Sequence, residues 1–447
     1  MKFHQPTATL LSTSTLLLAT TAYATNGMLM EGYGPISTAM GGASQAIEHG
    51  NAAMAQNPAT LGLMPDGTSR LDLAIGELGP KVRSSTAAES AESGGDSYVM
   101  PAVGYVKRVG PLTYGVGMFA QGGMGTEYGA DAWLSAPAGV SSNLPSRSEL
   151  GVGNVLFPVT YQFHPDWIVG ATFRFMWSSL DMRMTASGAQ LGQMVADSGQ
   201  APSGNFAQML PGMAGAPWAN ISFSDDNDFT GAAKATGWGG SLGTVWRATP
   251  EVTVGASYQF QTALDDMETG ATSATLSAMG GFADHGRLTV LDFQMPAVFA
   301  IGASWLASPT WLFAADIRNI EWSDVMESFR MRYDSANGLG SVHFTMPQHW
   351  KDQVVLNLGA AWKANDRLTL RAGLNLSDNP VPDGYVCPMF PATVSNHVSV
   401  GGGYALSDTS AINVSLTHAP SHTVQTPTAI DISHGQTNLM LMYSQRF

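Results

Sequence analysis

Charged residues, basic residues and cysteine are all scarce in this 447-residue sequence. Only 12% of the residues are charged, roughly half the share that is typical of soluble domains. Lysine and arginine number 20 against 34 aspartates and glutamates, which gives a net charge of −14 and excludes the basic clusters that nucleic-acid binding needs. The single cysteine, Cys387, allows no internal disulfide. Something other than water must face much of this chain.

Long apolar runs are also missing. After the N-terminus no stretch of about 18 apolar residues occurs, and the mean hydropathy is only +0.02, so membrane-spanning helices are excluded. The remaining structure that satisfies every backbone group in lipid is a closed β-barrel. The first residues combine Lys2, an apolar stretch and the small-x-small sequence Ala22-Tyr23-Ala24. This combination is typical of an export signal, and we expect residues 1–24 to be removed.

From Ser69 onward, apolar and polar residues alternate with the period of a β-strand. In residues 368–376 the leucines share one face and Arg371 lies on the other. In residues 311–318 the aromatic residues oppose Asp316 and Arg318. An arginine on a lipid-facing surface costs roughly 2–4 kcal/mol. The apolar faces are therefore predicted to contact outer-membrane lipid, and the charged faces to line a lumen.

The joints between alternating segments are short and long in turn. Six short turns lie near residues 108, 164, 248, 307, 364 and 406, and seven long loops near 83–97, 126–148, 185–231, 266–286, 334–350, 380–395 and 425–436. Outer-membrane barrels have short periplasmic turns and long extracellular loops. The sequence thus predicts an all-β fold, a 14-stranded antiparallel transmembrane β-barrel over residues 68–447. A secreted β-sandwich is the alternative, but a sandwich gives no reason for joints that alternate so regularly.

Residues 25–67 precede the first alternating run and are rich in Gly, Ala and Met. They are too few to form a core of their own, and too apolar for a solvated tail. The lumen of such a barrel is wider than the wall side chains can fill. We therefore expect a hatch inside the lumen, with a disordered segment as the alternative.

Several motifs resemble one family of membrane proteins. "TNGMLMEGYGP" at 25, Asn57-Pro58-Ala59, "FAQGGMGTEYG" at 119, "IEWSDVM" at 320 and "SDNPVPDG" at 377 occur in this order. Over almost the whole mature chain they resemble the FadL-type outer-membrane transporters of long-chain fatty acids, which include aromatic-hydrocarbon channels. The C-terminal Phe447 is similar to the outer-membrane assembly signature. The resemblance implies the outer membrane of a Gram-negative bacterium and the barrel assembly machinery as a partner.

The resemblance also implies a mechanism, which is passive uptake of hydrophobic molecules without ATP. In this family a hatch blocks the axial route, ligand is collected between long loops, and it leaves sideways where the third strand is kinked. Asn57, Pro58 and Ala59 match the hatch motif and are assigned to gating. The kink maps onto Gly122, Gly123 and Gly125, since glycine permits bulged geometry. An ordinary glycine-rich strand end is the alternative at that position.

The longest loop, 185–231, carries apolar side chains in place of the charges expected at a surface. We assign to a ligand groove Leu191, Met194, Val195, Met209, Leu210 and Met213. Methionine adapts to ligands of differing shape, but a loop that packs on its neighbours is an equally simple explanation. Arg183 and Arg330 are candidate partners for a fatty-acid carboxylate, with a rim or lumen salt bridge as the alternative. The ligand remains open between fatty acids and neutral hydrophobic compounds.

No catalytic pattern supports an enzyme. Gly239–Gly243 fits the motif of a hydrolase nucleophile elbow, but it lies inside an alternating strand and lacks the helix that the motif requires. The ten histidines have no metal-ligand spacing. We expect no cofactor, no metal, no nucleic-acid partner and a monomeric chain. A general aqueous porin and an outer-membrane enzyme or adhesin are the alternative functions, and the predicted hatch argues against an open porin.

Overall fold

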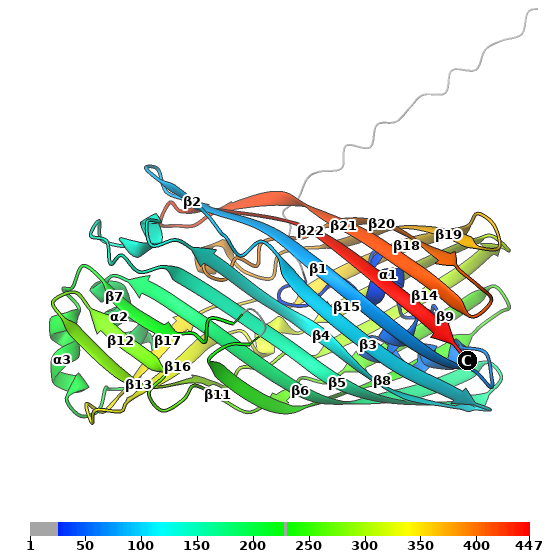
Figure 1. The fold of residues 1–447 in the computed structure, drawn as a ribbon, viewed down its shortest axis with the longest axis horizontal. Helices are drawn as coiled ribbons and strands as arrows, with labels where there is room; N and C mark the ends of the chain where they lie inside the picture. Colours follow the sequence, from blue (N-terminus) through cyan, green and yellow to red (C-terminus); the bar gives the residue numbers. More distant parts are fainter. Residues whose placement is uncertain (1–25, 228–229) are drawn as a thin grey trace, which may run out of the picture.

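The computed structural model of the chain describes residues 26–227 and 230–447. Its main feature is a single antiparallel sheet that curls into a closed barrel (Figure 1). The first strand, β1 (Ser69–Ser85), pairs along its length with the last, β22 (Asp431–Arg446), and this pairing closes the wall. The predicted signal peptide, residues 1–24, lies outside the described residues.

The other strands complete the wall, although several of them pair with strands that are not their neighbours in sequence. Up to residue 268 the chain contains β2 (Ser90–Glu92), β3 (Tyr98–Val109), β4 (Leu112–Tyr128), β5 (Ser146–His164), β6 (Trp167–Ala186), β7 (Ala219–Phe223), β8 (Ala233–Arg247), β9 (Val252–Gln259), β10 (Ala263–Leu264) and β11 (Met267–Glu268). The remainder contains β12 (Ala274–Ala278), β13 (Phe282–Leu291), β14 (Val298–Ser308), β15 (Trp311–Ile320), β16 (Ser328–Ser335), β17 (Ser341–Pro347), β18 (Gln353–Lys363), β19 (Leu368–Ser377), β20 (His397–Ala405) and β21 (Ser410–Gln425). Each predicted short turn joins two consecutive strands of this series.

Helices are few and short. They are α1 (Gly34–Thr38), η1 (Asn51–Ala55), η2 (Pro58–Leu63), η3 (Trp133–Ser135), α2 (Gly188–Asp197), α3 (Phe206–Met213), η4 (Trp322–Asp324) and η5 (Asp383–Tyr385). None of the helices in the described part of the chain is long and apolar enough to cross a membrane. The wall is all-β, as the alternation predicts.

The predicted count of fourteen strands is wrong, because the sheet contains 22 strands. Three alternating segments are each broken in two: residues 260–262 separate β9 from β10, residues 292–297 separate β13 from β14, and residues 321–327, which contain η4, separate β15 from β16. Four of the predicted loops carry the five further strands β2, β7, β11, β12 and β17. Alternation can resume in phase after a short break, so the pattern does not reveal where a strand stops.

These additional strands lie mostly at the end of the barrel that carries the long loops (Figure 1). There β7, β12, β13, β16 and β17 pair in this order, and α2 and α3 lie beside them. At Asp292 the backbone has a φ of 54°, which no regular strand adopts, and Pro296 has no N–H to donate. The strand therefore breaks here, and β13 pairs with β16 whereas β14 pairs with β15.

The two faces of the wall confirm the predicted alternation. On β15, Phe313 and Ile317 are exposed on the outside, whereas Asp316 and Arg318 are buried. Leu374 on β19 is likewise exposed. Near the short turns Trp167 stacks on Trp246 and Trp311 on Trp362, with ring centroids 5.5 Å and 5.9 Å apart. Aromatic residues of this kind mark the membrane–water boundary in barrels.

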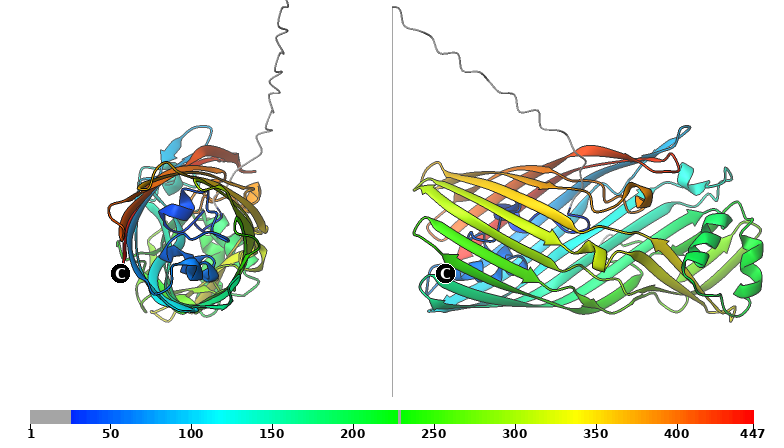
Figure 2. Two further views of the ribbon diagram at one scale, coloured as in Figure 1. Left: turned by 90° about the vertical axis from the view of Figure 1, so that its right-hand side faces the viewer. Right: turned by 180° about the vertical axis from the view of Figure 1, so that it is seen from behind.

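Residues 26–67, which we call the N-terminal segment, lie inside the barrel (Figure 2). Between Asn26 and Met64 every residue except Glu48 is at least partly buried. Apolar side chains of the segment, including Met54 and Leu61, form a core with Leu156 of the wall. A separate and larger apolar core fills the half of the barrel nearer the long loops.

The exposed apolar band gives a test of the membrane-facing register. We expect Leu374→Arg to lower the free energy of unfolding by about 2–4 kcal/mol, because it places a cation against lipid. Unfolding by guanidinium in phospholipid vesicles, followed by tryptophan fluorescence, measures the change. Ser407→Arg, in a water-exposed short turn, is the matched control. Equal stability of the two variants would contradict the proposed lipid contact of β19.

Candidate functional site

A gap in the wall between β3 and β4 is the centre of the candidate site. These strands pair from Val109↔Leu112 to Val103↔Met118. Beyond that point, residues 98–102 of β3 pair with β1, and residues 119–128 of β4 pair with β5, but in the described structure the two stretches do not pair with each other. We call this opening the wall gap.

Local sequence explains why the two strands separate. Gln121 is an extra residue on β4, because Ala120 and Gly122 pair with the consecutive residues Gly153 and Val152 of β5. Such a bulge bends a strand and disrupts its ladder. On the opposite side, Pro101 of β3 has no N–H with which to extend the pairing. The bulge thus lies at Gln121, immediately before Gly122, Gly123 and Gly125, the residues to which the kink is assigned from the sequence.

The N-terminal segment occupies the free edge of β4. Leu29 forms an antiparallel bridge with Gly122, and the N–H of Gly123 donates to the carbonyl of Met28 at 3.2 Å. The Tyr33 hydroxyl donates to the carbonyl of Gln121 at 2.7 Å. A Cβ at Gly122 would collide with the Met28 carbonyl. Glycine at this position is thus required by the close approach of the segment.

A cavity of about 320 Å³ lies behind the wall gap. Residues from both edges of the gap line it, with Val99 and Met100 on β3 and Phe119 and Gly123 on β4. Trp177 of β6 contributes to the same surface. Val99 is also exposed on the outside of the barrel. The cavity therefore extends from the interior of the barrel to its lipid-facing side. Gly122 and Gly125, the other predicted kink residues, line it as well.

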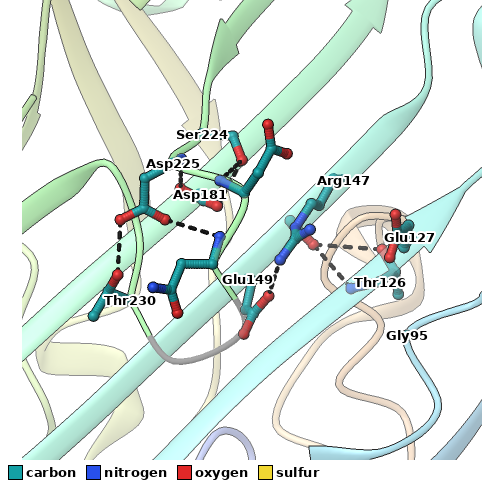
Figure 3. Close-up of polar contacts among 12 residues, drawn as sticks. Gly95, Thr126, Glu127, Arg147, Glu149, Asp181, Ser224, Asp225 and Thr230 are labelled. Atoms are coloured by element: carbon teal, nitrogen blue, oxygen red, sulfur yellow. Dashed lines mark hydrogen bonds and ion pairs between the residues drawn. The ribbon is translucent and has the colours of Figure 1, made fainter. Parts of the chain in front are cut away.

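Polar contacts lie next to this cavity (Figure 3). Glu149 lines the cavity, and its Oε2 lies 2.6 Å from Nη2 of Arg147. Asp181 is buried and accepts hydrogen bonds from the Ser224 hydroxyl at 2.6 Å and the Asp225 N–H at 3.1 Å. These carboxylates are bonded within the protein.

The predicted gating residues anchor the N-terminal segment to the wall. Asn57 is fully buried, and its amide nitrogen donates to the carbonyls of Gln45 (2.8 Å) and Thr244 (3.2 Å). Its Oδ1 accepts from the N–H of Ala59 at 3.1 Å, which caps η2. The Pro58 carbonyl accepts from Thr160 of β5 at 2.9 Å. The three motif residues are therefore held in place, and they lie in a different part of the segment from residues 28–33, which contact the wall gap.

Charged residues of the wall hold the rest of the segment. Asp316 accepts from the N–H groups of Ser44 and Gln45, at 2.6 Å and 3.0 Å. Arg174 donates to the Ala55 carbonyl at 3.0 Å. The alternation of apolar and polar residues predicts that Asp316 faces the lumen. It does not predict the hydrogen bonds of Asp316 to the N-terminal segment.

One ion pair joins the segment to β1. Glu48 Oε1 lies 2.6 Å from Nη1 of Arg70. Partial burial raises the pKa of Glu48, but the charge and hydrogen bond of Arg70, together with the N–H of Gly50, outweigh it and lower the pKa to about 2. The carboxylate is thus charged across the neutral range, and the pair persists there.

The six apolar loop residues lie on α2 and α3 at the long-loop end. Leu191 and Met213 are buried, and Met194, Val195, Met209 and Leu210 are half-buried. All of them except Met209 pack against the large interior core. This arrangement matches the alternative of a loop that packs on its neighbours, and a role in ligand capture stays a prediction.

The two candidate arginines are already paired with carboxylates. Arg183 Nη2 lies 2.5 Å from Asp226, and Arg330 Nη2 lies 2.6 Å from Asp292. Neither arginine lines the cavity behind the wall gap. Their geometry is that of salt bridges at the rim.

The family of the chain follows from comparison with known proteins. Residues 15–445 match the family model described as outer membrane protein transport protein (OMPP1/FadL/TodX). The chain belongs to this family. It is an outer-membrane β-barrel transport protein of the Gram-negative type and not an enzyme. The end of the barrel with the long loops is therefore extracellular, and the end with the short turns is periplasmic.

Solved structures of this family show the same architecture. The toluene transporter TodX of Pseudomonas putida is 33% identical, with a TM-score of 0.84 over 93% of this chain and 99% of that one. The toluene transporter TbuX of Ralstonia pickettii is 31% identical, with a TM-score of 0.79 over 93% and 99%. A FadL homologue from Pseudomonas aeruginosa, 13% identical with a TM-score of 0.71, shares the fold.

One curated relative matches over a shorter stretch. It is an uncharacterised protein from the 5' region of the phosphoenolpyruvate carboxykinase gene of Chlorobium limicola, 52% identical over 67 residues. The match spans 15% of this OMPP1/FadL/TodX chain and about a third (33%) of that protein.

Several residues of the site are not among the sequence predictions. Pro101 and Gln121 help to open the wall gap, and Met28 and Tyr33 bond its edge. Pro101 could have been found from the sequence, because proline is unusual inside an alternating strand and indicates a break in pairing. The hydrogen-bond partners of Gln121 are distant along the chain, with Tyr33 88 residues away and Asn154 33 residues away, and no local pattern indicates them.

Asn57 provides a test of how the N-terminal segment is anchored. We expect Asn57→Ala to destabilise the packed segment by about 1–2 kcal/mol, because one helix cap and two further hydrogen bonds are lost. Hydrogen exchange measured by mass spectrometry should become faster in residues 45–64 and stay unchanged in the wall. Asn365→Ala, which removes an equivalent acceptor in a periplasmic turn, should leave the segment protected. Unchanged exchange in the Asn57 variant would argue against this anchor.

Proposed function

We propose that this protein is a passive channel for small neutral aromatic hydrocarbons, which enter the cavity behind the wall gap and leave sideways into the membrane. The observation that carries the proposal is the end of β3–β4 pairing at Val103↔Met118, beside a cavity lined from both strands. The similarity to two toluene transporters supports the choice of ligand class. As the sequence suggests, we take residues 25–67 as the hatch and residues 68–447 as the barrel.

An apolar solute has a physical reason to take the lateral route. Each CH₂ group that moves from water into an apolar environment gains about 0.8 kcal/mol. A route that ends in lipid keeps this gain, whereas an axial pore filled with water would lose it. The N-terminal segment fills the lumen, and Asn57, Asp316 and Arg174 bond it to the wall. Movement down a gradient needs no other source of energy.

We assign the first contact with ligand to the helices α2 and α3. Their half-buried side chains Met194, Val195 and Met209 lie at the extracellular end and are apolar. Leu191, Leu210 and Met213 support them from the core side. Flexible methionines suit brief contact with ligands of several shapes.

The charges around the cavity favour a neutral ligand over a fatty acid. Among the described residues that line the cavity there are two carboxylates, Glu31 and Glu149, and no lysine or arginine. Glu149 is paired with Arg147, so an anionic ligand would meet the carboxylate of Glu31 in a place with little water, which is costly. Because Arg183 and Arg330 already pair with Asp226 and Asp292, they offer no free cation in its place.

Removal of the bulge tests the lateral exit. Deletion of Gln121 restores regular pairing of Ala120 and Gly122 with β5, and we expect β4 to continue its pairing with β3. Uptake of radiolabelled toluene by cells should fall to the background of cells without the protein. Deletion of Phe163, the extra residue of a bulge at the periplasmic end of β5, is the matched control. Normal uptake by the Gln121 deletion, at equal surface amounts, would rule out this exit. Valine at Gly122 is less informative, because it would also displace Met28.

A second test concerns the charge of the ligand. Binding to the purified protein in detergent can be followed by tryptophan fluorescence, since Trp177 lines the cavity. We expect toluene to bind more tightly than octanoate, and Arg183→Ala and Arg330→Ala to change the Kd for toluene by less than about twofold. Tighter binding of octanoate that either arginine variant weakens would show that a fatty acid is the ligand.

A further inference from the structure

One end of the cavity behind the wall gap is polar. Glu31 of the N-terminal segment and His434 and Gln436 of β22 line it there. The amide nitrogen of Gln436 lies 2.9 Å from Oδ1 of Asn438, and the amide nitrogen of Asn438 lies 3.4 Å from Oε1 of Glu31. The three side chains thus form a short chain of hydrogen bonds that begins at a carboxylate.

The carboxylate fixes the direction of every bond in this chain. Oε1 of Glu31 accepts, so Asn438 presents its N–H₂ group to it. Its Oδ1 then faces Gln436, which must donate through nitrogen. The polar atom of Gln436 that this network leaves without a partner is therefore its carbonyl oxygen, an acceptor.

The orientation of His434 follows from a similar constraint. Its Nδ1 lies 2.7 Å from the carbonyl oxygen of Pro391, which can only accept, so Nδ1 carries the hydrogen. In a neutral imidazole Nε2 is then a bare acceptor. Nε2 has no hydrogen-bond partner among the described residues, and the side chain is only 7% exposed. A buried acceptor without a partner is destabilising, so a group that binds there has to bring a donor.

We infer that this polar end binds the hydroxyl group of a phenol-type ligand, while the apolar remainder of the cavity holds its ring. This inference rests on the proposed function and extends its ligand class from aromatic hydrocarbons to neutral aromatic compounds that carry a hydroxyl group. The unpaired groups, Nε2 of His434 and Oε1 of Gln436, are acceptors, and Glu31 adds a negative charge beside them. A hydroxyl donor satisfies them, a plain hydrocarbon leaves them unpaired, and a carboxylate is repelled.

Ligands matched in size isolate the contribution of the donor. We compare p-cresol, which has a hydroxyl donor, with 4-methylanisole, in which a methyl group replaces that hydrogen, and with toluene. For the full-length purified protein in detergent, we expect p-cresol to bind roughly tenfold more tightly than 4-methylanisole, the size of effect expected for one or two buried hydrogen bonds. The ratio of the two Kd values is the readout, so a uniform change in affinity cancels.

Variants then assign the preference to residues. His434→Phe and Gln436→Leu should each reduce the ratio, and the double variant should bring it to within about twofold of one. His418→Phe on the adjacent β21, which does not line the cavity, is the matched control and should keep the full ratio. Heat-modifiable migration on gels establishes that each barrel is folded.

Three results would overturn the inference, and only the last of them also refutes the proposed function. Equal binding of p-cresol and 4-methylanisole, with toluene bound, would refute the hydroxyl site alone and leave the hydrocarbon channel intact. The hydroxyl site is equally refuted if the double variant keeps the full preference. If the wild-type protein binds none of the three compounds, the proposed function is refuted together with this inference.

Discussion

A strand edge inside a membrane needs hydrogen-bond partners, and the wall gap creates such an edge on β4. Lipid offers no donors or acceptors, so each backbone group left open there is costly. The N-terminal segment supplies the partners: Tyr33 bonds the Gln121 carbonyl, Leu29 bridges Gly122, and the Met28 carbonyl accepts from Gly123. The segment that fills the lumen thus also completes the wall, and the opening at β4 depends on its presence.

The same need for hydrogen-bond partners explains why polar side chains of the wall lie where the N-terminal segment passes. Asp316, Arg174 and Thr160 do not face water, because each one bonds a backbone group of the N-terminal segment. The alternation of β15 keeps Asp316 away from lipid, and the segment gives the carboxylate two N–H donors. Two independent constraints, one outside the barrel and one inside, select the same register. A one-residue slip of this strand would violate both.

How much the sequence predicts depends on how local each signal is. Alternation assigns Ile317 to lipid and Asp316 to the lumen, and turn residues locate all six periplasmic turns, because both patterns span only a few residues. The strand count fails because alternation continues across the break at 292–297. The motif at Asn57 is found by resemblance, but its bonds to Gln45 and Thr244 join distant parts of the chain. The wall gap escapes prediction for the same reason, since Gln121 looks like an ordinary strand residue.

A passive channel needs a closure that is weak at the exit and strong elsewhere, and the N-terminal segment has this distribution of contacts. Near the wall gap it makes two hydrogen bonds with the backbone of β4. The Tyr33 hydroxyl donates to the Gln121 carbonyl, and the Gly123 N–H donates to the Met28 carbonyl within the Leu29–Gly122 bridge. Each contributes about 0.5–1.5 kcal/mol net, so releasing both costs about 1–3 kcal/mol. Thermal motion crosses such a barrier without a nucleotide or an ion gradient. Around Asn57 the segment is fully buried and bonded to the wall. Under the proposed function, the first residues leave the edge of β4 for a passing ring while the bore stays closed.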